Sequence, residues 1–85
     1  MSMQVYFVVQ AYQETSRGAL VALPAMAASD ADHALRLAAR QKRVAAGLIA
    51  FSRRGDPETG DYEAAVVLSR WGRVPDDGEG AEAAA

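Results

Sequence analysis

A single stretch of this chain, from Ser29 to Leu48, has the periodicity of an amphipathic helix. Ser29 and Asp32 match a capping box at its start, and Gly47 is typical of a helix end. One broad face of this helix must pack against another element. Its members are Ala31, Ala34, Leu35, Leu37, Ala38, Gln41, Val44, Ala45 and Leu48. Because most of them are alanines, we expect the helix to approach a sheet closely.

The segments before and after this helix have the composition and alternation of β-strands. We expect two strands before it, at residues 3–12 and 19–23, and two after it, at residues 48–51 and 62–71. Pro24 ends the second strand because proline cannot donate to the ladder. These elements predict a small α+β domain of order β-β-α-β-β, with a four-stranded, mainly antiparallel sheet and one helix packed on one face. The first and third strands are apolar on both faces, so we expect them to be central neighbours.

The length of 85 residues allows one domain with a small core. We expect residues 1–75 to form this single domain. Residues 76–85 contain four acidic residues and no large apolar side chain, so we expect them to be a disordered acidic, alanine-rich tail. Residues 1–75 carry nine basic and seven acidic residues, which makes the expected domain slightly basic.

The composition excludes several classes of protein. The chain has no cysteine, which rules out disulfides and thiolate metal sites and is typical of a reducing cytoplasm. The N-terminal segment lacks the basic region and the long apolar region of a signal peptide. No run of about 18 apolar residues is present, so we expect no membrane span. We therefore expect a cytoplasmic protein that does not act in a membrane.

Candidates for catalysis and metal binding are few. His33 is the only histidine, and its spacing from Ser29 and Asp32 does not form a nucleophile, base and orienter, so we expect a solvated side chain. The acidic residues between 56 and 63 do not follow the EF-hand spacing, and Pro57 and Gly60 explain this segment as a turn. We predict no catalytic residue, no cofactor and no metal site, and hence no enzyme.

The polar face of the expected helix forms a basic stripe. It consists of His33, Arg36, Arg40 and Arg43, within a segment between Asp32 and Asp56 that has six basic residues and no acidic one. One hypothesis is a solvated face or an interface with an acidic protein partner. The other is a nucleic-acid contact, because arginines on a rigid element suit phosphate groups. Arg53, Arg54, Arg70 and Arg73 would extend the basic surface if they fold nearby.

The sheet offers a second candidate surface. One helix covers only one face of a four-stranded sheet, so the other face needs cover from elsewhere. We expect Tyr6, Val8, Tyr12 and Trp71 to lie on that second face and to form a homodimer interface. A small domain without disulfides or metals often gains burial from a second subunit. Base stacking is the alternative role for Trp71, which lies between two arginines.

Several runs of sequence resemble a family of short uncharacterised bacterial proteins. These runs are residues 6–10 (Tyr-Phe-Val-Val-Gln), 17–20 (Arg-Gly-Ala-Leu), 51–62 and 65–68 (Ala-Val-Val-Leu). The resemblance covers most of residues 3–75. It implies one domain of conserved length, and it implies no catalytic or binding residues, because no activity is established for that family.

The sequence favours a small non-enzymatic module for protein interaction or assembly, most simply a homodimer with an unknown protein partner. The alternative is a nucleic-acid-binding module that uses the basic helix stripe. These two functions need different surfaces, and only the folded arrangement of the arginines can distinguish them.

Overall fold

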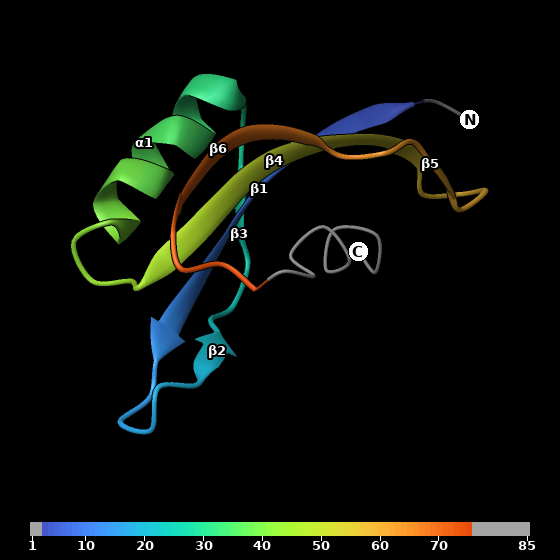
Figure 1. The fold of residues 1–85 in the computed structure, drawn as a ribbon. Coiled ribbons are helices and arrows are strands. Elements are labelled where there is room, and N and C mark those ends of the chain that lie inside the picture. The colour runs from blue at the N-terminus through green and yellow to red at the C-terminus, as the bar shows by residue number, and fades with distance from the viewer. Residues whose placement is uncertain (1–2, 76–85) are drawn as a thin grey trace.

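The computed structural model describes residues 3–75, which form one helix and six strands (Figure 1). The α+β class predicted from the sequence is confirmed. The elements in chain order are β1 (Gln4–Glu14), β2 (Leu20–Ala22), β3 (Met26–Ala28), α1 (Ala31–Gln41), β4 (Gly47–Asp56), β5 (Asp61–Tyr62) and β6 (Val66–Gly72). The expected tail, residues 76–85, lies outside the described residues.

Two long strands form the centre of the sheet. β1 and β4 are antiparallel, with a register that runs from Gln4 opposite Gly55 to Tyr12 opposite Gly47. β2 and β3 pair with the other edge of β1, while β5 and β6 pair with the other edge of β4. The strands expected at residues 3–12 and 48–51 are therefore central neighbours, as their apolar character on both faces indicated.

The prediction of four strands is wrong, because one further strand forms in the expected connector and one expected strand is divided in two. Residues 25–28, expected to be a connector, contain β3, which pairs with Phe7–Val9 of β1. Pro24 separates β3 from β2. The strand expected at residues 62–71 is divided by residues 63–65 into β5 and β6. Segments of two or three residues are too short for an alternating pattern, so only their partners reveal them.

The helix is shorter than predicted at both ends. Asp30, not Ser29, is the N-cap: its backbone is extended, and its Oδ1 accepts a hydrogen bond from the His33 amide at 2.7 Å. The helix ends at Gln41, and Gly47 is the first residue of β4 rather than the helix end. Val44, expected on the buried face, is instead 66% exposed in the intervening turn.

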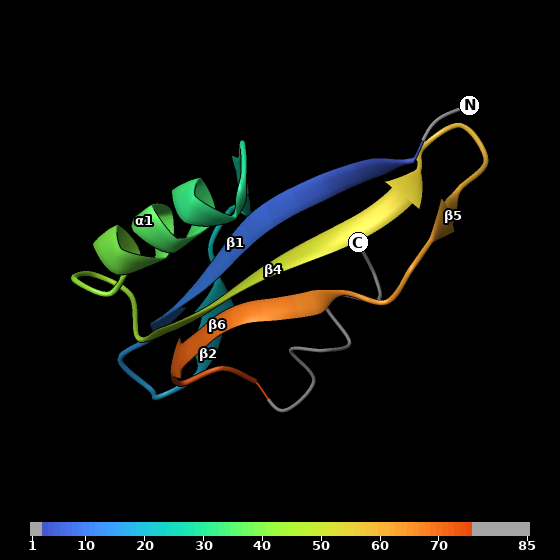
Figure 2. The same cartoon turned by 90° about the horizontal axis from the view of Figure 1, so that it is seen from above.

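Helix α1 packs over one end of the sheet through its alanines. Ala34 and Ala38 are buried against Val9, Leu48 and Ala50 from the two central strands, in one apolar cluster. Small side chains at this contact allow the helix to lie close to the sheet. Figure 2 shows that β1 and β4 continue well beyond the helix, so the far end of this face carries no helix.

The opposite face of the sheet has its own smaller cluster. Tyr12, Ile49 and Phe51 are buried there and pack with Val8, Leu20, Ala65 and Val74.

Gly72, the last residue of β6, has a φ of +71°, a conformation that favours glycine. The chain then continues to Arg73, which forms an ion pair with Glu14 and donates a hydrogen bond to the Gly18 carbonyl at 3.1 Å. This strap ties the end of β6 to the hairpin between β1 and β2.

The capping arrangement predicts different effects for two adjacent substitutions. Asp30→Ala removes the side-chain acceptor for the His33 amide and should lower the free energy of unfolding by about 1 kcal/mol. Ser29→Ala leaves that acceptor in place and should cost clearly less. Chemical denaturation of both variants measures the difference, and an equal or larger loss for Ser29→Ala would contradict this assignment of the cap.

Leucine truncations test the placement of the core. Leu48 is fully buried between the helix and the sheet, so Leu48→Ala should lower the free energy of unfolding by about 2–5 kcal/mol. Leu35 lies on the helix but is 43% exposed, so Leu35→Ala should cost less than about 1 kcal/mol. Thermal and denaturant unfolding give both values. Comparable losses would show that α1 is rotated from the described position.

Candidate functional site

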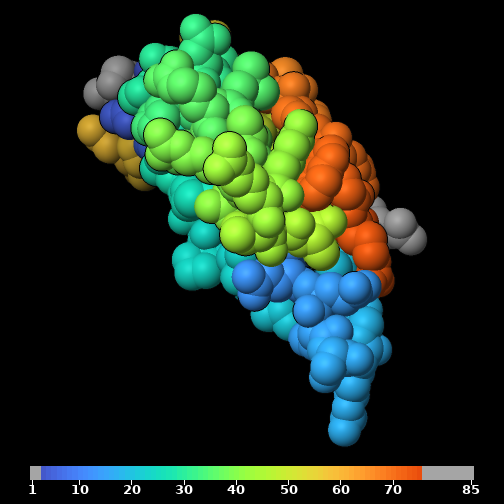
Figure 3. All heavy atoms as spheres, turned by 90° about the vertical axis from the view of Figure 1, so that its left-hand side faces the viewer, coloured from blue at the N-terminus to red at the C-terminus, as the bar shows by residue number. Residues whose placement is uncertain are grey.

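The basic stripe predicted on the helix is divided between the helix and the turn that follows it. Arg36 and Arg40 lie exposed on the outer side of α1, whereas Arg43 follows the helix in the turn. Figure 3 shows the helix and this turn as one raised surface next to β6. Within the helix the stripe consists of His33, Arg36 and Arg40, and Arg43 adjoins it from the turn.

His33 has a local structural role that its spacing did not predict. Its Nδ1 accepts a hydrogen bond from the Ser29 amide at 3.0 Å, and the Ser29 Oγ lies 3.2 Å from the same atom. Activation of a serine hydroxyl requires a third group that orients the histidine. Among residues 3–75, no carboxylate contacts this imidazole. The hydrogen bond between Ser29 and His33 therefore stabilises the start of the helix, next to the Asp30 cap.

The other arginines are dispersed over the fold. Arg53 and Arg54 are neighbours in β4, so they point to opposite faces of the sheet. The Arg54 Nε lies 4.0 Å from a Glu63 carboxylate oxygen, and Arg73 pairs with Glu14 in the strap. These three arginines therefore lie on other segments than Arg36 and Arg40.

Trp71 does not lie with the tyrosines on the predicted dimer face. It is opposite Leu48 in the register of β4 and β6, and directly opposed residues share a face. Leu48 packs against the helix, so Trp71 also lies on the helix side, where the Lys42 Nζ is 5.9 Å from the centre of its ring. The prediction of a second-face position for Trp71 is therefore wrong.

The three remaining residues of the predicted dimer face do lie on the second face. Tyr12 is only 5% exposed because Ile49 and the neighbouring apolar side chains cover it. Tyr6 and Val8 are half-buried at the end of the sheet that lies beyond the helix. Only these two residues contribute to a common open surface.

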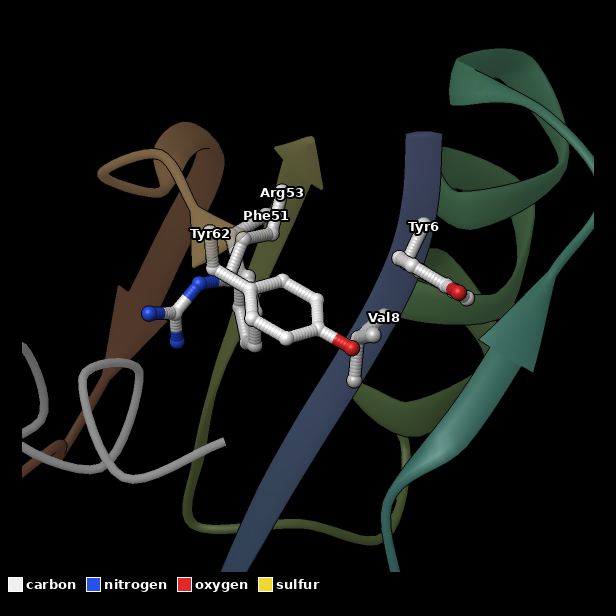
Figure 4. A pocket seen from close by; sticks show the side chains of 5 residues that line it. All are labelled: Tyr6, Val8, Phe51, Arg53 and Tyr62. Carbon is white, nitrogen blue, oxygen red and sulfur yellow. The ribbon is translucent and has the colours of Figure 1, made fainter. Parts of the chain in front are cut away.

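That open surface contains a pocket of about 250 Å³, lined by Tyr6, Val8, Phe51, Arg53 and Tyr62 (Figure 4). Tyr62 comes from β5 and lies opposite Gly55, where a Cβ atom would collide with its ring. The Tyr6 and Tyr62 ring centres are 6.3 Å apart, and the Arg53 guanidinium carbon is 5.3 Å from the centre of the Tyr62 ring. The pocket wall therefore contains three aromatic rings, and the pairing of β1, β4 and β5 sets their positions.

Sequence reasoning placed Phe51 with Tyr6 and Val8 on the uncovered face of the sheet, but it missed Arg53 and Tyr62. The alternation along β4 places Phe51 and Arg53 on one face, so this part of the signal was available. The position of Tyr62 depends on the pairing of Gly55 with β5, which the sequence did not specify. Only the register brings the two tyrosines together.

The chemistry of the pocket is that of a binding surface. Its polar groups are two phenols and one guanidinium, and the Arg53 Nε donates to the Glu63 carbonyl at 3.2 Å. Partial burial, together with the neighbouring Tyr62 phenol and the Asp56 carboxylate, raises the pKa of Tyr6 above its ordinary value of 10.0. Tyr6 is therefore neutral at physiological pH. Apolar walls with polar tips suit an apolar group of a bound molecule.

Within residues 3–75, no group of three or more His, Cys, Asp or Glu side chains is arranged to hold a metal ion. The described part of the chain also contains no helix that is both long and apolar enough to cross a membrane.

Comparisons with protein-family models, curated proteins and solved structures find no match to this chain. The resemblance to a family of short bacterial proteins stays a prediction.

The pKa of Tyr6 provides a test of the pocket. Tyr62→Phe removes the second phenol, so the pKa of Tyr6 should fall toward 10.0, although burial still raises it. Because the folded state holds this proton more tightly than the unfolded state does, stability should decrease as the pH rises through the folded-state pKa. An NMR titration of labelled tyrosine measures the pKa. An unchanged Tyr6 titration in Tyr62→Phe would contradict the described proximity.

Proposed function

We propose that this protein is a small non-enzymatic interaction or assembly module that works as a homodimer. The observation that carries this proposal is the exposure of large apolar side chains on both faces of the sheet, in the parts that the helix does not cover. Val66 is 60% exposed, Val67 45% and Val5 50%. Burying such surface contributes roughly 25 cal/mol per Å², and a domain of this size has little other burial to rely on.

These exposed side chains are clustered rather than scattered over the surface, and clustering supports an interface. Val66 and Val67 are adjacent in β6, and Trp71 lies further along the same strand. Isolated apolar residues on a surface are ordinary, but a strand that exposes several of them on both faces is typical of a contact site. The open aromatic pocket adjoins the same end of the sheet and adds a place for a partner side chain.

The arrangement of charges favours this function over nucleic-acid binding. A nucleic-acid interface needs several basic side chains on one continuous surface, because each phosphate contact adds to affinity. The exposed basic residues of the helix and its following turn, Arg36, Arg40, Lys42 and Arg43, form one short group, while Arg54 and Arg73 lie near carboxylates in other parts of the fold. The pocket has no nucleophile with a base beside it, so binding fits it better than catalysis.

Multi-angle light scattering after size exclusion tests the proposed homodimer. At micromolar concentration the mass should be about twice the 9.0 kDa of the chain, and it should fall toward the mass of one chain on dilution. The same mass should persist after nuclease treatment, which controls for bound nucleic acid. A monomer throughout the accessible concentration range would contradict the proposal.

A further inference from the structure

The two edges of the sheet differ in how well they are protected. At one edge, β2 and β3 are three residues each and are separated by Pro24, which breaks the row of backbone groups. At the other edge, β6 is seven residues long and contains no proline. Within residues 3–75, no strand pairs with its outer side (Figure 2). An exposed continuous edge offers backbone donors and acceptors to another strand.

A bulge in β6 determines which side chains share a face. Ala50 of β4 lies opposite Ser69, but the next residue, Phe51, lies opposite Val67, so β6 contains one extra residue, Leu68. Leu68 packs with the helix-side cluster, and Ser69 faces the same side through its pairing with Ala50. The alternation of side chains therefore shifts by one position at residues 68 and 69.

The register with β4 places every other residue of β6. Val66 pairs with Ser52 and Trp71 with Leu48, which puts both on the helix side. Val67 pairs with Phe51, and Arg70 pairs with Ile49, which puts both on the second face. The order in which side chains point to the two faces is therefore the same in both directions from the bulge.

From this symmetry we propose that the outer edges of β6 from two copies of this chain pair antiparallel, around a two-fold axis at the bulge. This inference rests on the proposed homodimer and specifies its interface. In this register, Val66 lies opposite Trp71 of the second copy, and Val67 lies opposite Arg70 of the second copy. Both members of each pair lie on the same face, as cross-strand neighbours must. A regular strand without the bulge would place them on opposite faces.

A second copy fits this edge better than an unrelated strand because the same residues complement one another. The exposed Val66 and the 38% exposed Trp71 meet twice, once on each side of the axis. Arg70 is the only charged residue in β6, and the register places it opposite Val67 rather than opposite its own copy. Pairing of the two β6 strands would join the two sheets into one, with both helices on the same face of it.

Two adjacent valines provide the experiment, since they face opposite sides of β6 and are both largely exposed. Val66→Asp places a carboxylate against Trp71 of the second copy twice per dimer, so the dissociation constant should rise at least about tenfold. Val67→Asp places a carboxylate opposite Arg70 of the second copy, so the dissociation constant should stay within about threefold of the wild-type value. Sedimentation equilibrium measures both constants, and circular dichroism with thermal melting checks that each variant is folded.

The reverse result, in which Val67→Asp dissociates the dimer and Val66→Asp does not, would overturn the edge pairing and favour contact through the second face. A dimer unaffected by either substitution would also overturn it. A wild-type monomer would instead show that the proposed homodimer is wrong, and this is measured before any variant. The failures of the two proposals are therefore distinguishable.

Cross-linking tests the register directly, because the chain has no native cysteine. In an equimolar mixture of the variants Val67→Cys and Arg70→Cys, left to exchange subunits, residue 67 of one copy lies opposite residue 70 of the other, so mild oxidation should give a covalent dimer. The two cysteines are placed on separate copies because the bulge sets residues 67 and 70 opposite Phe51 and Ile49, only two residues apart on β4, where a disulfide within one copy would compete. Each single-cysteine variant oxidised alone is the matched control and should give little covalent dimer. No cross-link in a mixture that is dimeric and folded would overturn the register.

Discussion

The antiparallel pairing of β1 with β4 is the interaction on which the rest of the structure depends. Its register fixes two sets of side chains at once, because neighbouring residues on each strand point to opposite faces. One set, including Val9 and Leu48, receives the helix, and the other set, including Tyr12 and Ile49, forms the second cluster. A shift of one residue in this register would exchange the two faces. Both clusters, and every edge strand, follow from this one ladder.

The helix contact sets the second constraint. Alanines at positions 34 and 38 allow α1 to lie close to the sheet, but they contribute little apolar area each. The helix is eleven residues long, whereas β1 has the same number of residues at about twice the rise per residue. Helix α1 therefore covers only part of the sheet. The uncovered part contains the exposed valines and the aromatic pocket on which the proposed function rests.

The bulge in β6 links the local geometry to the proposed assembly. One extra residue at Leu68 shifts the alternation of side chains between the two faces. Trp71 therefore lies on the helix side of the sheet, beside Lys42. The same shift makes the exposed residues of β6 match across the proposed two-fold axis. Bulges at sheet edges commonly prevent pairing, but here the bulge is the feature that brings side chains into agreement.

The sequence by itself determined the α+β class, the place of the helix and the central position of β1 and β4, because these depend on the spacing of apolar residues along the chain. The tertiary structure decided what depends on pairing between distant segments: the division of the edge strands, the contact of Tyr62 with Gly55, and the face of Trp71. The stripe of basic residues illustrates the limit. Its spacing was visible in the sequence, but the end of the helix at Gln41 and the cap that binds His33 were fixed by hydrogen bonds that the spacing does not encode.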